Sequence, residues 1–265
     1  MLKRANRTHK EPAQTATLPT PTVVQQDGHR HALLARMAGH RQRTGRPFVT
    51  LSYAQSVDGC IAARLGQPLA LSGPGSLILT HQLRAAHEAI LVGIRTVLAD
   101  NPRLTVRLVS GCNPQPIIAD SRLRFPSDAK LLQNPERAAW IATSEQADGQ
   151  RQKLLEAAGA RILRLPVNTR GQVDLAALLE RLGQLGINSL MVEGGTRIIT
   201  SFLSDRLVDS VVLTIAPKLI GGLRAVRKLR HVDSVHLPRL DNVRYQQLED
   251  DMIMWGEPIW EEQEV

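Results

Sequence analysis

Short apolar runs alternate with helical segments along most of this chain, and this alternation constrains the fold more than any other feature. The apolar runs are rich in Val, Ile and Leu, as is typical of buried strands. Strands alternating with helices predict an α/β fold with a mostly parallel central sheet and helices on both faces. The last two runs have little between them and predict an antiparallel hairpin at the C-terminal edge of the sheet. We expect strands at residues 48–54, 89–93, 116–120, 138–143, 160–165, 188–193, 207–216, 242–248 and 251–256.

The expected helices lie between these strands, and the first of them has clear start signals. Ser72 is suited to be its N-cap, and Pro74 fits in its first turn. We expect helices at residues 74–87, 95–100, 147–158, 174–185 and 196–204.

The positive charge is concentrated at the N-terminus. The chain has a net charge of +8 at pH 7, but residues 1–47 hold nine Lys and Arg against two acids, so +1 remains for the rest. A nearly neutral body argues against nucleic acid as a partner. We expect a disordered basic tail over residues 1–28, a short helical arm over 29–46, one domain over 47–258, and an acidic C-terminal tail over 259–265.

Several classes of protein are excluded by what the sequence lacks. Cys60 and Cys112 make neither a disulfide framework nor a zinc cluster, so we expect no metal. No apolar run is long enough to span a membrane, and no secretory signal is recognisable, so a cytoplasmic location is expected. A basic, Thr-rich segment at 1–26 leaves an organellar transit peptide open. The usual Rossmann, NTPase and hydrolase motifs are missing, so in an enzyme a soluble cofactor would carry the chemistry.

The strongest local signal is a strand that ends in a carboxylate and two glycines, Met191-Val192-Glu193-Gly194-Gly195-Thr196-Arg197. Two glycines allow a ligand to approach the backbone, and the helix that follows presents free N–H groups to an anion. The segment alone fits a plain strand-to-helix turn equally well. However, ligands of parallel sheets bind beyond the carboxyl ends of the strands. The candidate segments there are Ser56 to Gly59, Gly93 to Thr96, Asp120-Ser121, Thr143-Ser144 and Glu193 to Thr196.

Three blocks together resemble the reductase domain of riboflavin biosynthesis, a family with a dihydrofolate-reductase-like fold. The first block is PFVTLS at 47–52 with SVDG at 56–59, and the second is AILVGIRTVLADNPRLTVR at 89–107. The third is VEGG at 192–195, followed by IAPKLIGG at 215–222. The order and spacing match the family from about residue 47 to 256.

The resemblance implies an oxidoreductase that uses NADPH to reduce a ribosylamino-pyrimidine 5′-phosphate to its ribitylamino form, with hydride transfer to C1′. It also implies a homodimer. Glu193 would contact the substrate and assist proton movement at C1′. Thr143, Ser144 and nearby arginines are candidates for the 2′-phosphate of NADPH. The resemblance and the strand ends together assign Ser56, Asp58, Gly93, Thr96, Asp100, Gly194, Gly195, Thr196 and Arg197 to the cofactor. The substrate residues are Arg84, Arg103, Leu104, Arg107 and Glu193.

Two positions depart from the bacterial bifunctional members of this family. These members often have a Ser and then a Trp after the position of Gly66, where this chain has Pro68 and Ala70.

The preceding deaminase domain is also missing, so we expect a stand-alone reductase. The sequence leaves open whether the substrate is the diamino or the deaminated pyrimidine. Alternatives are a reductase of another pterin- or pyrimidine-like substrate, and a non-catalytic nucleotide-binding relative.

Overall fold

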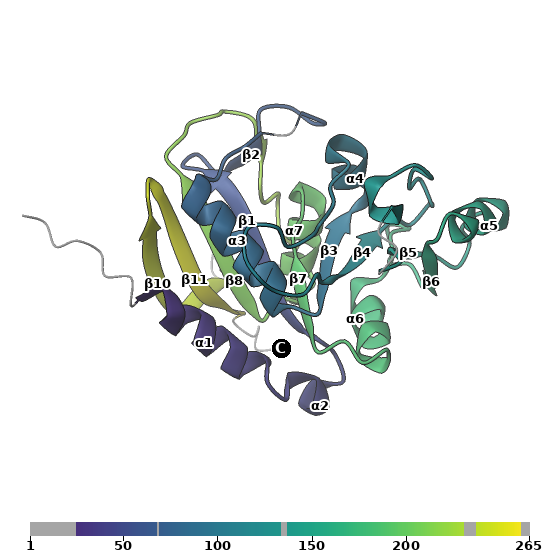
Figure 1. Cartoon of the computed structure of the whole chain (residues 1–265), viewed down its shortest axis with the longest axis horizontal. Helices are drawn as coiled ribbons and strands as arrows, with labels where there is room; N and C mark the ends of the chain where they lie inside the picture. The colour runs from purple at the N-terminus through teal and green to yellow at the C-terminus, as the bar shows by residue number, and fades with distance from the viewer. Residues whose placement is uncertain (1–24, 68, 134–136, 231–236, 261–265) are drawn as a thin grey trace, which may run out of the picture.

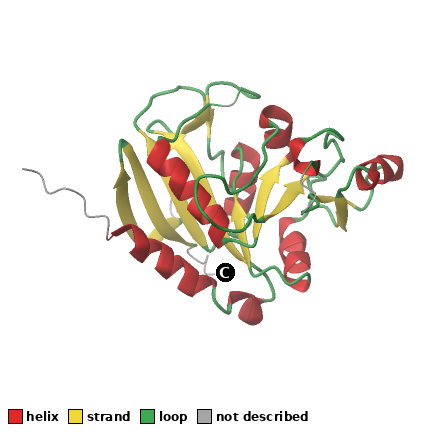
Figure 2. Ribbon diagram, viewed as in Figure 1, coloured by secondary structure: helices red, strands yellow, loops and turns green. Residues whose placement is uncertain are grey.

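The computed structural model describes residues 25–67, 69–133, 137–230 and 237–260, which fold around a nine-stranded sheet (Figures 1 and 2). The strand order across the sheet is β10-β11-β8-β1-β7-β3-β4-β5-β6. The strands are β1 (Phe48–Ser56), β3 (Ala89–Gly93), β4 (Gln115–Ala119), β5 (Trp140–Ser144), β6 (Arg161–Leu165), β7 (Ser189–Val192), β8 (Ser210–Ala216), β10 (Arg239–Leu248) and β11 (Asp251–Ile259). Two further short strands, β2 (Cys60–Ala62) and β9 (Leu223–Arg224), pair apart from this sheet and were not expected.

The pairing confirms the expected α/β class. All neighbours from β8 to β6 are parallel, and β11 is antiparallel to both β8 and β10. The C-terminal strands therefore form the expected edge hairpin.

The helices are α1 (Gln25–Met37), α2 (His40–Thr44), α3 (Pro74–Ala86), α4 (Ile94–Asp100), α5 (Gly149–Ala157), α6 (Leu175–Gln184) and α7 (Thr196–Ser204), with a 3₁₀ turn at Lys130–Leu132.

Helices cover both faces of the sheet because successive strand residues point to opposite sides. In β7, Leu190 and Val192 pack with α6 and α7, whereas Met191 between them packs with α1 and α3. In β3, Ile90 and Val92 pack with α4 and α5. Both faces of the central strands are therefore buried, which explains why these strands read as continuous apolar runs in the sequence.

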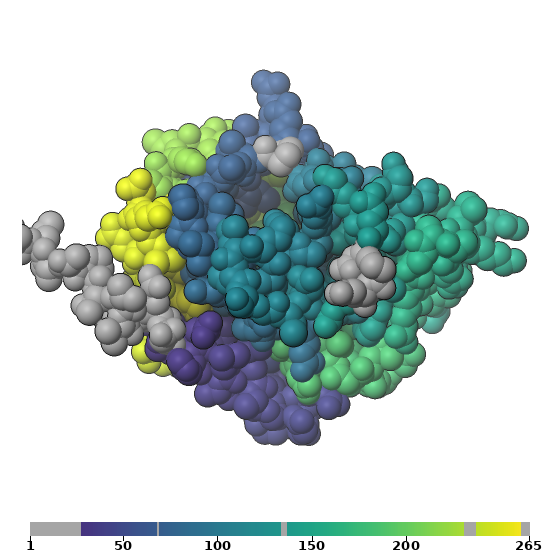
Figure 3. All heavy atoms as spheres, in the orientation of Figure 1, coloured from purple at the N-terminus to yellow at the C-terminus, as the bar shows by residue number. Residues whose placement is uncertain are grey.

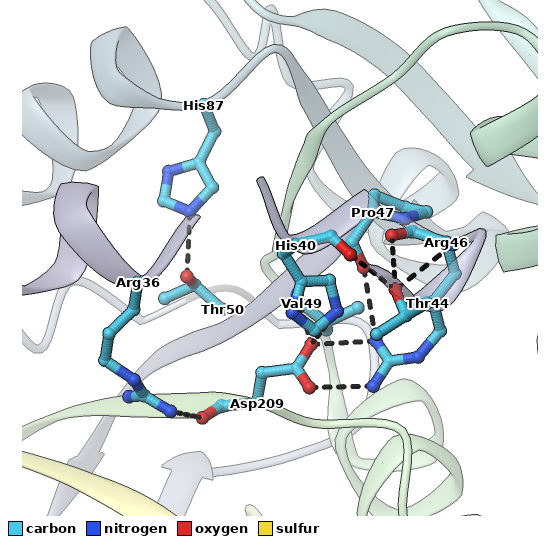
Figure 4. A network of polar contacts seen from close by, with 9 residues as sticks. All are labelled: Arg36, His40, Thr44, Arg46, Pro47, Val49, Thr50, His87 and Asp209. Atoms are coloured by element: carbon cyan, nitrogen blue, oxygen red, sulfur yellow. Dashed lines mark hydrogen bonds and ion pairs between the residues drawn. The ribbon is translucent and has the colours of Figure 1, made fainter. Parts of the chain in front are cut away.

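The N-terminal arm docks at the end of the sheet where the parallel strands begin. Asp209, just before β8, accepts two hydrogen bonds of 2.7 Å from the Arg46 guanidinium and one of 2.8 Å from the Val49 N–H (Figure 4). Leu33 and Met37 of α1 are buried against the sheet. Within the described residues the first helix of the arm, α1, starts at Gln25, and Gly39, with φ of 67°, separates α1 from α2. Residues 1–24 and 261–265, which hold most of the two expected tails, lie outside the described residues.

The start of α3 differs from the sequence-based expectation. Pro74 is the first helical residue as expected, but Gly73, not Ser72, is the N-cap, and no side chain caps the helix. The Gly73 N–H instead donates to Asp251 Oδ2 at 2.8 Å. A carboxylate from the distant β11 therefore lies at the start of α3, where its charge suits the helix dipole.

Candidate active site

A cavity of about 930 Å³ lies beyond the carboxyl ends of the central parallel strands. Ala54 of β1, Gly93 of β3, Ala119 of β4 and Glu193 after β7 all line it. β7 ends at Val192, so a gap opens beyond it between the longer β1 and β3. The volume is at the upper end of the range of small-molecule sites. Ten of the predicted site residues line this cavity: Arg84, Gly93, Thr96, Asp100, Leu104, Glu193, Gly194, Gly195, Thr196 and Arg197.

The glycines beside the cavity differ in what a side chain at each position would meet. A Cβ on Gly93 would lie 2.7 Å from Ile198 Cγ1, and one on Gly194 would lie 2.8 Å from Ile198 Cβ. These two glycines therefore allow α7 to pack closely onto the strand ends. Gly195, the N-cap of α7, is different, because its nearest neighbour would be Thr96 Oγ1 at 3.6 Å. The protein therefore leaves open space beside Gly195, at the start of α7.

The Glu193 carboxylate is held by Arg84 in a side-on ion pair. Arg84 Nε and Nη2 donate to Oε1 and Oε2 of Glu193, both at 2.7 Å, and Arg84 Nη1 donates to the Thr105 carbonyl at 3.2 Å. Both side chains are mostly buried, with 12% and 19% exposed. Arg84 belongs to the last turn of α3, so the pair joins a helix on one face to the end of a central strand.

The connection 101–114 between α4 and β4 crosses the front of α3 (Figure 3, teal against blue). The Arg107 N–H donates to His81 Nδ1 of α3 at 2.9 Å, which fixes this connection. Leu104 is buried with φ of 53°, and it lines the cavity. Arg103 and Arg107, which were expected to contact the substrate, are exposed and are not among the residues that line the cavity. Arg107 still lies close enough to Arg84 for their repulsion to lower its pKa, after the larger effect of desolvation.

Four arginines gather around the start of α7. Desolvation lowers the pKa of Arg197, and repulsion from Arg95, Arg227 and Arg124 lowers it further. All four side chains line the cavity. Asp120 Oδ1 lies 3.7 Å from Arg124 Nε, but no acid among the described residues forms an ion pair with the other three. The cluster therefore has an excess of positive charge beside Gly195 and favours an anionic ligand. Sequence analysis assigned only Arg197 of these four.

Ser56 and Asp58, which were expected to contact the cofactor, are not among the residues that line the cavity. The Ser56 hydroxyl donates to Asp58 Oδ1 at 2.5 Å, and the Ile220 and Gly221 N–H groups donate to the same carboxylate at 3.1 and 2.7 Å. These bonds, with Ser56 first, hold the pKa of Asp58 well below its usual range. The two residues fasten the turn after β1 to the segment after β8.

Thr143 and Ser144 also lie outside the cavity, because β5 continues through both and buries them. Asp100 lies at the cavity as expected, and partial burial raises its pKa. Tyr53 and Thr214 line it without having been predicted. Ala70 lines the cavity, whereas Pro68 lies outside the described residues.

The described residues contain neither a candidate metal site nor a membrane-spanning helix. They contain no group of three or more His, Cys, Asp or Glu side chains that could hold a metal ion. Among the described helices, none has the length and apolar composition needed to cross a membrane.

Together these features define an α/β protein with a ligand cavity at the carboxyl ends of its parallel strands, built around a glycine turn and a helix start. The chain belongs to the family of the RibD C-terminal domain, whose model matches residues 47–254.

Relatives of two lengths support this assignment. The chain is 42% identical over 180 residues to the 2,5-diamino-6-ribosylamino-4(3H)-pyrimidinone 5′-phosphate reductase of Methanothermobacter thermautotrophicus, covering 67% of this chain and 81% of that protein. It is 36% identical over 186 residues to the riboflavin biosynthesis protein RibD of Actinobacillus pleuropneumoniae, covering 70% of this chain. The chain spans only about half the length of that RibD, 49%.

Two solved structures are similar in fold. Acinetobacter baumannii RibD, form 1, has a TM-score of 0.72 and 26% identity, covering 86% of this chain and 62% of that one. The Saccharomyces cerevisiae riboflavin biosynthesis reductase Rib7 has a TM-score of 0.68 and 28% identity, covering 84% and 94%. Both support the resemblance derived from the three sequence blocks.

Proposed function

We propose that this protein is an NADPH-dependent reductase of 2,5-diamino-6-ribosylamino-4(3H)-pyrimidinone 5′-phosphate. The observation that carries this proposal is that ten residues assigned from the family resemblance and the strand ends together line one cavity. The diamino substrate is favoured over the deaminated one because of the Methanothermobacter thermautotrophicus relative. The match covers 81% of that protein, which is named as the reductase of the diamino compound. NADPH would supply a hydride to C1′ of the ring-opened imine form, and the former imine nitrogen would gain a proton.

The cofactor end of the cavity is the start of α7. Gly195 leaves open space where a pyrophosphate could approach the helix N–H groups. Arg95, Arg124, Arg197 and Arg227 surround this point with positive charge, which suits a cofactor that carries a third phosphate. This arrangement supports NADPH over NADH, and it takes over the role that the sequence suggested for Thr143 and Ser144.

The substrate end is formed by Glu193, Leu104 and the connection that carries Arg103 and Arg107. Glu193 can accept hydrogen bonds from the substrate, since a carboxylate has about four acceptor sites and Arg84 occupies two. Arg103 and Arg107 are exposed on the connection that carries Leu104, and from there they would reach the substrate phosphate.

The test follows NADPH oxidation by its near-ultraviolet absorbance with the diamino and the deaminated substrate in parallel. We expect turnover with the diamino compound and a higher Michaelis constant for NADH than for NADPH. Arg197→Gln should raise the Michaelis constant for NADPH at least tenfold and leave that for NADH within about threefold. Arg181→Gln, far from the cavity on α6, is the matched control. Absence of turnover with both substrates would contradict the proposal and favour a binding protein.

Gly195→Val separates cofactor binding from folding. Only Thr96 Oγ1 lies near the added carbon, so the variant should fold normally and lose NADPH binding. Unchanged affinity would remove the pyrophosphate from this turn. The homodimer and the cytoplasmic location stay predictions of the resemblance, and light scattering of the purified protein tests the first.

A further inference from the structure

The gap beyond β7 connects the two faces of the sheet at the cavity. Val192, the last residue of β7, pairs with Leu51 of β1 on one side and with Leu91 of β3 on the other. From Ser52 onward, no described strand therefore pairs with β1 on its β7 side. The start of α7 lies on one face of the sheet and Arg84 of α3 on the other. The gap is thus the passage between the cofactor end and the substrate end of the cavity.

Tyr53 stands beside this gap on the face that α7 covers. It is the second residue of β1 after the last pair with β7, and its side chain packs with the cluster that includes Ile198 and Ile199 of α7. Its neighbours Ser52 and Ala54 point to the opposite face, because side chains alternate along a strand. Tyr53 is also the only aromatic side chain among the described residues that line the cavity. The gap is therefore flanked on its α7 face by one aromatic ring.

The Tyr53 ring is held by packing and not by polar contacts. Its hydroxyl forms no hydrogen bond with any described residue, although the hydroxyl of a buried tyrosine usually has a partner. Burial raises the pKa of Tyr53 to about 12, so the phenol stays neutral at physiological pH and keeps its O–H as a donor. A bound molecule can therefore use both the face of the ring and a hydroxyl that the protein leaves unused.

We propose that Tyr53 packs against the nicotinamide ring of the cofactor and holds it in the gap. This inference rests on the proposed function. With the pyrophosphate at the start of α7 and the substrate beside Glu193, the nicotinamide must enter the gap to bring its hydride to C1′. A planar ring in that place meets Tyr53, and two aromatic rings attract each other beyond the area that they bury. Because hydride transfer needs close and aligned reacting atoms, a residue that fixes the nicotinamide also contributes to the rate.

Binding measurements without turnover test this contact. Isothermal titration calorimetry compares NADPH with 2′-phospho-ADP-ribose, which has the same phosphates but no nicotinamide. Tyr53→Leu should raise the Kd for NADPH about 3- to 10-fold and leave the Kd for 2′-phospho-ADP-ribose within about twofold. Tyr53→Phe, which keeps the ring, should stay within about twofold for both ligands. Equal weakening of both ligands by Tyr53→Leu, or no weakening at all, would overturn the proposal.

The other tyrosine of the chain provides the matched control. Tyr245 lies on β10 with 63% exposed and does not line the cavity, so Tyr245→Leu should change neither Kd.

Tyr53→Trp reports the ring contact by spectroscopy, and it takes the place of Tyr53→Leu if that variant does not fold. An indole stacked on the electron-poor ring of NADP⁺ should add a charge-transfer absorption band at longer wavelength than the protein band. Addition of 2′-phospho-ADP-ribose should produce no such band, and Tyr245→Trp should show none with either ligand. Absence of the band in a Tyr53→Trp protein that binds NADP⁺ would contradict the contact.

Kinetics separate the cofactor from the substrate as the partner of Tyr53. A nicotinamide contact predicts that Tyr53→Leu lowers kcat at saturating NADPH and leaves the KM of the pyrimidine substrate within about twofold. A raised substrate KM with unchanged NADPH affinity would mean that Tyr53 contacts the pyrimidine, and the inference would be wrong. Failure of the wild-type protein to bind NADPH would refute the proposed function itself. Equal losses for NADPH and 2′-phospho-ADP-ribose in an active enzyme would refute only the role of Tyr53.

Discussion

Acidification should destabilise this protein through His87, the residue that fastens the end of α3 to the sheet. Its ring is buried, with 4% exposed, and burial lowers its pKa from 6.5 to about 4. The Leu83 carbonyl can only accept, so Nδ1 carries the proton and Nε2 accepts from the Thr50 hydroxyl. A second proton on the ring would require the Thr50 hydroxyl to turn around so that its oxygen accepts.

The direction of the pH effect follows from this lowered pKa. Between pH 6.5 and 4 the unfolded chain binds a proton at His87 that the folded chain does not, so stability falls as the pH falls. The contribution is fully present above pH 6.5. A pKa difference from 6.5 to about 4 corresponds to about 3 kcal/mol of unfolding free energy in total, or about 1 kcal/mol per pH unit near pH 5.

Urea denaturation at several pH values, in the wild type and in His87→Asn, measures this contribution. Asn keeps a donor for the Leu83 carbonyl and cannot titrate, so the variant should show a shallower dependence on pH by about 1 kcal/mol per pH unit. His29, His40 and His81, whose pKa values are also lowered by burial, are present in both proteins and cancel in the comparison. Equal slopes would show that His87 does not differ in protonation between the folded and unfolded states.

Three further predictions concern the arm and its docking. Asp209→Ala should lower the free energy of unfolding by about 2–4 kcal/mol in urea denaturation, because it leaves the Arg46 guanidinium and the Val49 N–H without their acceptor; a loss below 1 kcal/mol would contradict this. Gly183→Ala should destabilise α6 severely in thermal melts, since its Cβ would lie 1.9 Å from the Gly45 carbonyl oxygen, whereas Gly149→Ala, with open space around it, should have little effect. Removal of residues 1–24 should preserve turnover, but removal of 1–46 should cause aggregation in size-exclusion chromatography, because it exposes the surface that Leu33 and Met37 cover.

The sequence predicted the sheet well because most of its strands are buried on both faces and carry their own apolar signal. The bounds of α7 agree with the expectation at both ends, since a glycine turn precedes it and an amphipathic pattern runs through it. The strands β2 and β9, with three and two residues, are too short to show any periodicity. Ser72 is not the cap of α3, and the carboxylate that binds at this helix start, Asp251, comes from far along the chain. Local patterns carry no information about such a partner.

The sequence predicted those site residues that belong to one continuous motif. It did not predict those that separate loops bring to the cavity. Glu193 and the glycine turn come from one continuous segment, so their proximity follows from the sequence. Arg227 reaches the cavity from the segment after β9, and only the fold brings it near Arg95 and Arg197. Ser56 and Asp58 were assigned by their place after a strand, but the turn that they make points them at a neighbouring backbone.

The contact of Ile198 with both Gly93 and Gly194 restricts the order in which these positions can change during evolution. A methyl group at either glycine meets the Ile198 side chain at less than 3 Å, so each such change is harmful while the isoleucine is present. Shortening residue 198 first would leave a void that a later methyl group could fill. Substitutions at these three sites should therefore be epistatic. Whether a larger residue is tolerated at 93 or 194 depends on whether residue 198 has already been shortened. A library that randomises positions 93, 194 and 198 together should therefore recover larger residues at 93 or 194 only where residue 198 has been shortened.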